Sequence, residues 1–294
     1  MRDASNEDPV ATDEDPQSPD ARRPSPILIG TSGFSYDDWN GPFYPKGVPK
    51  RRWFEFYAAE FPCLEVNASY YSWLSARASE SLASRAPAGF RFSIKLHKNL
   101  THDREELREG ARATLEQNRP FVERGSLAVH LAQFPYSFRP GAVSWDYIER
   151  LADAVRPLCI EFRNVAWQRP ETTQQLHDLR VSMCVVDEPR LRGLMTFEPI
   201  VTAPPAYVRF HGRNAQKWFR HEEAWERYDY LYSTEELAER APYIMKLAKQ
   251  SDETFLFFNN HYGAQAVTNA RQMAETLGVA LPGQRSLFGE RAGQ

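Results

Sequence analysis

The stretch CIEFRNVAW, residues 159–167, joins a buried strand to two charges. Cys159, Ile160 and Phe162 are typical of a strand in a hydrophobic core. Glu161 and Arg163 lie two residues apart, so they point to the same face of that strand. A buried charge is costly unless it is paired or used for function. The stretch therefore predicts a core strand whose end enters a shared polar region.

Similar apolar runs recur along the chain and alternate with helical patterns. Strands are predicted at 27–30, 63–67, 90–96, 126–131, 159–163, 182–186, 206–211 and 254–259. Helices are predicted at 51–61, 103–125 (with a kink at Pro120), 144–155, 172–179, 234–250 and 266–278. Segments 72–86 and 189–200 have no clear pattern. Eight strands alternating with helices favour a parallel sheet covered by helices.

The fold class predicted from this order is α/β, a single (β/α)8 TIM-type barrel over residues 27–278. That span matches the length of about 250 residues typical of such barrels. An open, doubly wound sheet is the alternative, and the number of strands favours the barrel. Residues 1–26, rich in Asp, Glu, Pro and Ser, are predicted to be a disordered acidic tail. Gly278 is the expected C-cap of the last helix, and 279–294 a short C-terminal tail.

Composition limits the classes of function. The net charge of −3 gives no general attraction to nucleic acid, so any such contact needs a local basic patch. No apolar run approaches the roughly 20 residues that span a bilayer, and the N-terminus lacks a hydrophobic signal segment. Cys63, Cys159 and Cys184 lie in apolar surroundings, as expected for reduced, buried thiols. We therefore expect a cytoplasmic protein without membrane association.

Polar residues gather where the predicted strands end, and in a barrel these ends meet at one mouth, where active sites lie. The catalytic candidates are Glu65, Lys95, His102, Glu161, Asp187 and His211. The candidate substrate-binding residues are Thr31, Asn67, Gln133, Arg163, Arg209, Asn259 and Asn260. The competing interpretation is a buried network in which these acids and bases only neutralise one another. The ligand-site interpretation is favoured because all eight strand ends contribute.

Several kinds of chemistry remain open at such a mouth. Glu65, Glu161 and Asp187 are candidate oxygen ligands for a divalent metal such as Mg or Mn. Lys95 could form a Schiff base if burial lowered its pKa, but we expect the nearby acids to keep it charged. There is no HExxH pattern for zinc, and no GK[ST] or GxGxxG motif for a nucleotide cofactor.

The segment 212–233, GRNAQKWFRHEEAWERYDYLYS, interleaves cations with aromatic residues. This composition suits a nucleic-acid strand, whose phosphates and bases it could contact. A lid whose aromatic side chains pack on the barrel is the alternative.

The strand-end motifs resemble those of the YecE-like proteins, the family catalogued as domain of unknown function seventy-two. The resemblance covers about Ile27 to Leu277. It rests on GTSGFSYDDWNGPFYP, LEVNASYY, FSIKLHKNLTH, LAVHLAQFPYSF, IEFRNVAW, VVDEP, YVRFHGRN, YDYLYS and FFNNHYGAQAVTNA. NASYY departs from the more usual Asn-x-Thr-Phe-Tyr of the family, but Ser69 keeps the hydroxyl and Tyr70 and Tyr71 keep the aromatic rings. The resemblance implies a TIM-type barrel and no established reaction.

Three functional hypotheses follow. The first is a metal-assisted hydrolase of a phosphorylated or nucleic-acid substrate, with phosphate bound by Arg163, Arg209 and Lys95. The second is a non-catalytic adaptor that binds nucleic acid, and the third a lyase or isomerase of small carbonyl compounds that uses Lys95.

The C-terminal segment QRSLFGE, 284–290, suggests a partner. It resembles the Gln-x-x-Leu-Phe peptides that bind the bacterial sliding clamp, with Gln284 at the pocket rim and Leu287 and Phe288 as apolar anchors. The alternative is that Leu287 and Phe288 fold back onto the protein's own barrel.

Overall fold

The computed structural model describes residues 24–283, which form one closed barrel of parallel strands. The strands are β1 (Ile27–Ser32), β2 (Cys63–Val66), β3 (Arg91–Lys95), β4 (Leu127–Gln133), β5 (Leu158–Glu161), β6 (Ser182–Asp187), β7 (Ala206–Phe210) and β8 (Thr254–Phe258). Each strand pairs with the next, and β8 pairs with β1 from Ile27↔Thr254 to Thr31↔Phe258. This last pairing confirms the TIM-type barrel and excludes the open sheet.

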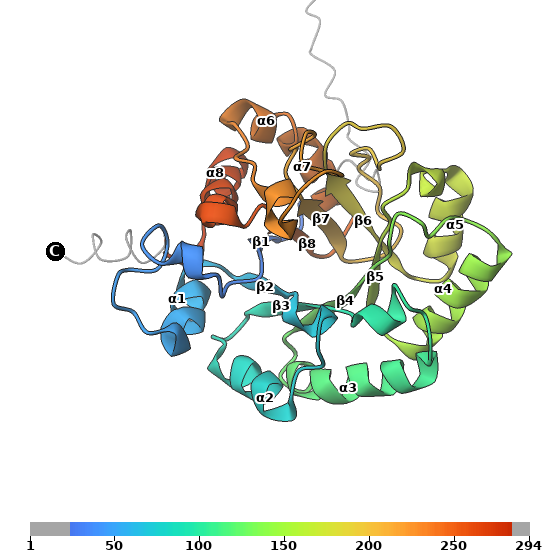
Figure 1. Cartoon of the computed structure of the whole chain (residues 1–294), viewed down its shortest axis with the longest axis horizontal. Helices are drawn as coiled ribbons and strands as arrows, with labels where there is room; N and C mark the ends of the chain where they lie inside the picture. Colours follow the sequence, from blue (N-terminus) through green and yellow to red (C-terminus); the bar gives the residue numbers. More distant parts are fainter. Residues whose placement is uncertain (1–23, 284–294) are drawn as a thin grey trace, which may run out of the picture.

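Helices surround the barrel as an outer ring (Figure 1). The α-helices are α1 (Trp53–Glu60), α2 (Ala76–Arg85), α3 (Leu107–Glu123), α4 (Ala142–Ala154), α5 (Pro170–Asp178), α6 (Thr234–Ala238), α7 (Ala241–Lys249) and α8 (Gln265–Leu277). Short 3₁₀ helices are η2 (Asp37–Trp39), η3 (Lys50–Arg52), η4 (Ala68–Tyr70), η5 (Lys98–Leu100), η6 (Val165–Trp167), η7 (Ala224–Tyr228) and η8 (Tyr262–Ala264). Most of the 3₁₀ helices follow the C-terminal ends of strands, so they shape the mouth.

Two predicted helices differ in their bounds. The helix predicted from residue 103 begins at Leu107, because Arg104 and Glu106 have left-handed backbone angles (φ 56° and 48°), and it continues past Pro120 to Glu123. The helix predicted at 234–250 is divided into α6 and α7. Pro242 lies in the first turn of α7, where its missing N–H is tolerated, whereas inside one long helix it would break a hydrogen bond.

The two segments without a clear pattern also differ from each other. Segment 72–86 contains α2, which begins after Ser75, whose side chain accepts a hydrogen bond from the Ala78 N–H. Segment 189–200 contains no helix or strand. Gly278 is the left-handed C-cap of α8, as predicted.

The barrel interior changes character along its axis. Its lower layers are apolar and fully buried, with Val129, Leu131, Cys159, Phe255 and Phe257 among them. Towards the C-terminal strand ends the inward positions become polar. All three cysteines are buried and free. The barrel therefore has an apolar core beneath a polar mouth.

The ends of the described chain are held against the barrel. The Ser25 N–H donates to the Ala248 carbonyl, and the Pro26 carbonyl accepts from Thr254. After α8, Leu281 is 2% exposed. The predicted tails are therefore too long by a few residues at both inner boundaries. Their remaining parts, 1–23 and 284–294, lie outside the described residues, and with them Gln284, Leu287 and Phe288.

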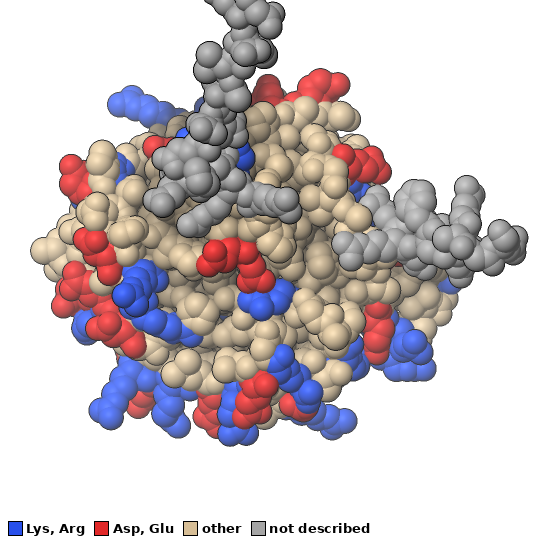
Figure 2. Space-filling model, turned by 180° about the vertical axis from the view of Figure 1, so that it is seen from behind, with Lys and Arg blue, Asp and Glu red and all other residues tan. Residues whose placement is uncertain are grey.

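The distribution of charged side chains is that of an ordinary globular protein surface. Acidic and basic side chains are intermingled on the face shown in Figure 2. Among the helices of residues 24–283, none combines the length and the apolar character required to cross a bilayer.

Candidate functional site at the barrel mouth

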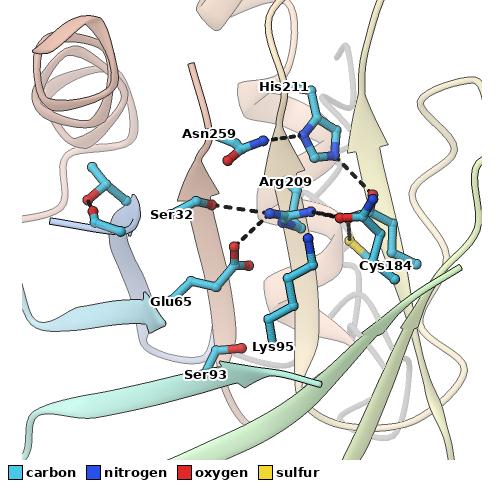
Figure 3. Close-up of polar contacts among 12 residues, drawn as sticks. Ser32, Glu65, Ser93, Lys95, Cys184, Arg209, His211 and Asn259 are labelled. Atoms are coloured by element: carbon cyan, nitrogen blue, oxygen red, sulfur yellow. Dashed lines mark hydrogen bonds and ion pairs between the residues drawn. The ribbon is translucent and has the colours of Figure 1, made fainter. Parts of the chain in front are cut away.

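Arg209 lies at the centre of the mouth, at the end of β7, and bridges two carboxylates (Figure 3). Its Nη2 is 2.6 Å from Glu65 Oε1, and its Nη1 is 2.5 Å from Glu161 Oε2. The guanidinium is 1% exposed, and both carboxylates are fully buried. Such pairing offsets the cost of burying three charges, although the Arg209 Nε has no hydrogen-bond partner among the described residues.

The network continues downward into the barrel through hydroxyl groups. The Tyr207 hydroxyl donates to Glu65 Oε2 at 2.6 Å and lies 2.6 Å from the Ser93 hydroxyl. Tyr207 and Arg209 are two residues apart on β7 and therefore point to the same side. Both oxygens of Glu65 are thus occupied by the protein itself.

Arg163, the second charge of the opening stretch, joins β5 to the end of β6. Its Nε lies 2.5 Å from Glu161 Oε1, and its Nη1 lies 3.2 Å from Glu188 Oε2. Although burial opposes ionisation, Arg163 and Arg209 hold the pKa of Glu161 well below its usual range. Burial outweighs Arg163 at Glu188 and raises the pKa of that carboxyl to about 7.

His211 is held as a neutral ring. The side-chain amide of Asn259 lies 3.0 Å from its Nδ1, which must then accept, while Nε2 lies 3.2 Å from Glu161 Oε1 without the geometry of a hydrogen bond. Burial and the nearby Arg163 lower the pKa of His211 to about 3. The buried ring is therefore neutral near pH 7 and lies between Asn259 and Glu161.

Lys95, at the end of β3, points toward Arg209 but differs from the other cations of the mouth (Figure 3). Within residues 24–283 its ammonium has no hydrogen bond or ion pair; its contact is the face of the Tyr70 ring, 4.4 Å away. The residue is partly exposed. Burial and the charge of Arg209 lower the pKa of Lys95 to about 7. The expectation that nearby acids keep it fully charged is therefore wrong, because burial and Arg209 outweigh Glu161 and Glu65.

His102 also contacts Tyr70, with the two ring centroids 5.2 Å apart in an edge-on arrangement. Its Nδ1 is 3.0 Å from the Thr101 hydroxyl. Burial and then Lys95 lower its pKa, so the ring is neutral near pH 7. A second group at the mouth consists of Lys95, Tyr70 and His102. It differs from the Arg209 network because its cation has no carboxylate partner among the described residues.

Three predicted site residues face away from the mouth. The Thr31 hydroxyl contacts Tyr57 of α1, and Asn260 donates to Asn269 of α8. Asp187 binds Arg213 (2.7 and 2.8 Å), Arg240 (2.6 Å) and the Tyr232 hydroxyl (2.9 Å) on the helix side of the barrel. Each of them is adjacent in sequence to a residue that points into the barrel. These inward neighbours are Ser32 for Thr31, Asn259 for Asn260 and Glu188 for Asp187.

This placement does not bring the three predicted metal ligands together. Asp187 is separated from Glu65 and Glu161 by the barrel wall, and the other two carboxylates are bound by arginines. Across residues 24–283, no group of three or more His, Cys, Asp or Glu side chains is arranged to hold a metal ion.

The remaining predicted binding residues do lie at the mouth. Gln133, partly exposed, accepts a hydrogen bond from Arg209 at 3.4 Å, and Asn259 contacts His211. Asn67 follows β2, and its buried Oδ1 has no hydrogen-bond partner in the described part of the chain. Asn67 therefore has an unused acceptor, as does Asn260, which faces away from the mouth.

Sequence reasoning missed Tyr207, Ser93 and Tyr70, and it chose Asp187 over the adjacent Glu188. Tyr207 and Ser93 could have been found by counting in steps of two from the polar strand ends, since Tyr207 precedes Arg209 and Ser93 precedes Lys95 in this way. Tyr70 lies in η4, and no local pattern links it to Lys95.

The segment 212–233 packs over the mouth as a lid. Trp218 is 3% exposed, and its ring faces the Arg163 guanidinium at 5.9 Å. Lys217 pairs with Glu226 at 2.7 Å, and Arg213 binds Asp187. Most of the basic side chains that suggested a nucleic-acid surface are therefore bound within the protein, whereas Phe219 is 60% exposed.

Fold and site together define a TIM-barrel protein with a polar cluster at the C-terminal ends of its strands. Comparison with known proteins then gives the family. A model described as "Protein of unknown function DUF72" matches residues 28–288, so the chain belongs to the DUF72 family, as the sequence motifs indicated.

Relatives agree with this assignment. The chain is 29% identical over 281 residues to the UPF0759 protein YunF of Bacillus subtilis, covering 87% of this chain and 96% of that protein. A solved DUF72 family structure from Thermotoga maritima is 36% identical, with a TM-score of 0.80, covering 86% of this chain and 99% of that one. Another from Enterococcus faecalis is 28% identical, with a TM-score of 0.77, covering 86% and 96%.

Proposed function

We propose that the chain is an enzyme acting on a small carbonyl compound, with Lys95 as its reactive amine. The observation that carries the proposal is the contrast between the cations of the mouth. Arg163 and Arg209 each bind two carboxylates, whereas the Lys95 ammonium has no ion pair within residues 24–283 and is partly exposed. An amine with a pKa near 7 is substantially neutral at physiological pH, which a nucleophile requires.

The chemistry uses the group around Tyr70. The neutral amine of Lys95 adds to the carbonyl carbon, and loss of the former carbonyl oxygen as water leaves a C=N bond. The two hydrogens of the amine leave with the oxygen as water, and His102, which also contacts Tyr70, is the candidate to relay them from nitrogen to oxygen. Asn67, with its free oxygen, is a candidate to orient the substrate.

Reductive trapping tests this proposal. The chain is incubated with a panel of small aldehydes and ketones and borohydride, and adducts are located by peptide mass mapping. We expect modification at Lys95 with a rate that rises with pH up to about 7 and then levels off. Lys98, exposed on η5, is the internal control. Equal labelling of both lysines, or no adduct, would reject the proposal.

The first hypothesis, a hydrolase of a phosphorylated or nucleic-acid substrate, keeps less support. Arg163 and Arg209 are neutralised by carboxylates, and the proposed metal ligands do not meet. The Lys95 ammonium would still attract an anion. Binding of phosphate by the parent chain that is lost in Lys95→Ala, without any carbonyl adduct in the trapping experiment, would favour this second substrate class.

A further inference from the structure

A groove lies between α1 and α2, at the end of the barrel opposite the mouth. Its volume is about 540 Å³, within the range of about 300–1,000 Å³ typical of ligand pockets. Its lining is mostly apolar and comprises Ala58, Ala59, Pro62, Pro87, Ala88, Gly89, Phe90 and Pro282, with Glu55 and Arg85 at the polar edge. This groove takes no part in the chemistry proposed at Lys95.

The chain itself leads into this groove. Leu281 is buried and Pro282 forms part of the lining, so the described chain ends at the groove wall. Leu287 is five residues beyond Pro282, and an extended chain covers about 17 Å over that distance. The family match also runs to residue 288, past the end of α8 at Leu277.

We propose that the segment 284–288 is a latch that seats Leu287 and Phe288 in the groove between α1 and α2. The two apolar side chains match the mostly apolar lining of the groove. Charge also matches. Glu55 Oε1 is 3.3 Å from Arg85, but Glu55 Oε2 is buried without a hydrogen-bond partner among the described residues, and Arg285 lies two residues before Leu287.

A seated latch has a direct effect on the predicted partner. Leu287 and Phe288 cannot fill this groove and a pocket on a sliding clamp at the same time. Binding of a partner to this segment would first require its release, so the groove competes with any external site.

Disulfide trapping in the full-length chain tests the latch. The pair Ala59→Cys and Phe288→Cys joins an exposed groove position to the segment, and the three native cysteines are buried and do not compete. Under mild oxidation we expect an intramolecular disulfide at least tenfold faster than in the control pair Val143→Cys and Phe288→Cys, since Val143 is 84% exposed on α4, away from the groove. Equal rates would overturn the proposal.

Hydrogen exchange provides a second, independent measurement. The double variant Leu287→Ala, Phe288→Ala should exchange faster in α1 and α2 than the parent chain, with α4 unchanged as the reference. No change in α1 and α2 would overturn the latch. So would clamp binding by the full chain as tight as that of the isolated peptide 284–294.

Discussion

Arg209 shows how one residue can look like a ligand-binding group in the sequence and be structural in the fold. Sequence reasoning placed it correctly at the mouth but could not tell whether its charge was free. Its two carboxylate partners, Glu65 and Glu161, come from strands far apart in the chain, and no local pattern predicts which acid pairs with which base. The unpaired state of Lys95 was hidden for the same reason.

We expect Arg209→Ala to destabilise the fold by about 3–5 kcal/mol, because it leaves Glu65 and Glu161 buried without a counter-charge. Urea unfolding at pH 7 measures this. Arg150→Ala is the matched control: Arg150 pairs with Asp146 on an exposed helix face, where loss of the pair costs less than about 1 kcal/mol. Equal stability of the two variants would mean that the network tolerates an uncompensated charge.

The strands were easier to predict than the details of the helices. Apolar runs bounded by polar residues identified all eight strands, because a strand in a parallel barrel is buried on both faces. Face assignment failed at Thr31, Asp187 and Asn260, each adjacent to a residue that faces inward, and strict alternation would have corrected it. The division between α6 and α7 could have been predicted by treating Pro242 as a helix breaker, although the apolar pattern around it is continuous.

Gly30 sets the spacing between β1 and β2. A Cβ added there would lie 2.3 Å from the Cys63 carbonyl oxygen, a backbone atom that cannot move without shifting β2. Gly30→Ala should therefore cost about 1–3 kcal/mol in the free energy of unfolding, or more. Gly141→Ala, where nothing lies within 4 Å and φ is an extended 174°, should cost less than about 1 kcal/mol. Thermal and urea unfolding of both variants distinguish the steric clash at Gly30 from the general effect of replacing a glycine by alanine.

At the scale of the whole molecule, buried histidines connect folding to pH. Burial lowers the pKa of His130 to about 4, and burial with Arg163 lowers that of His211 to about 3. Both rings are neutral in the folded state, whereas in the unfolded chain they gain protons below about pH 6.5. Glu188 acts in the opposite direction, since its raised pKa lets the folded state bind a proton between about pH 4.5 and 7.

His102 and His261, whose pKa values burial also lowers, act in the same direction as His130 and His211. The unfolded state therefore binds more protons than the folded state between about pH 4.5 and 6.5, so stability should fall as the pH falls through this window. Urea unfolding at pH 6.5 and 5 measures the slope. In His130→Asn one of the histidine contributions is gone, so the slope should be shallower than in the parent chain. A variant with the parent's slope would show that His130 is not the linked group.

Because β1 pairs with β8, the first and last strands of the barrel are neighbours, and both ends of the described chain lie on the face opposite Lys95. A short peptide joining these ends would leave every strand pairing in place. The chain could then be reopened at a surface loop between other strands, giving a circular permutant with the same mouth. Attached to a solid support through either end, the molecule would present that mouth to the solution.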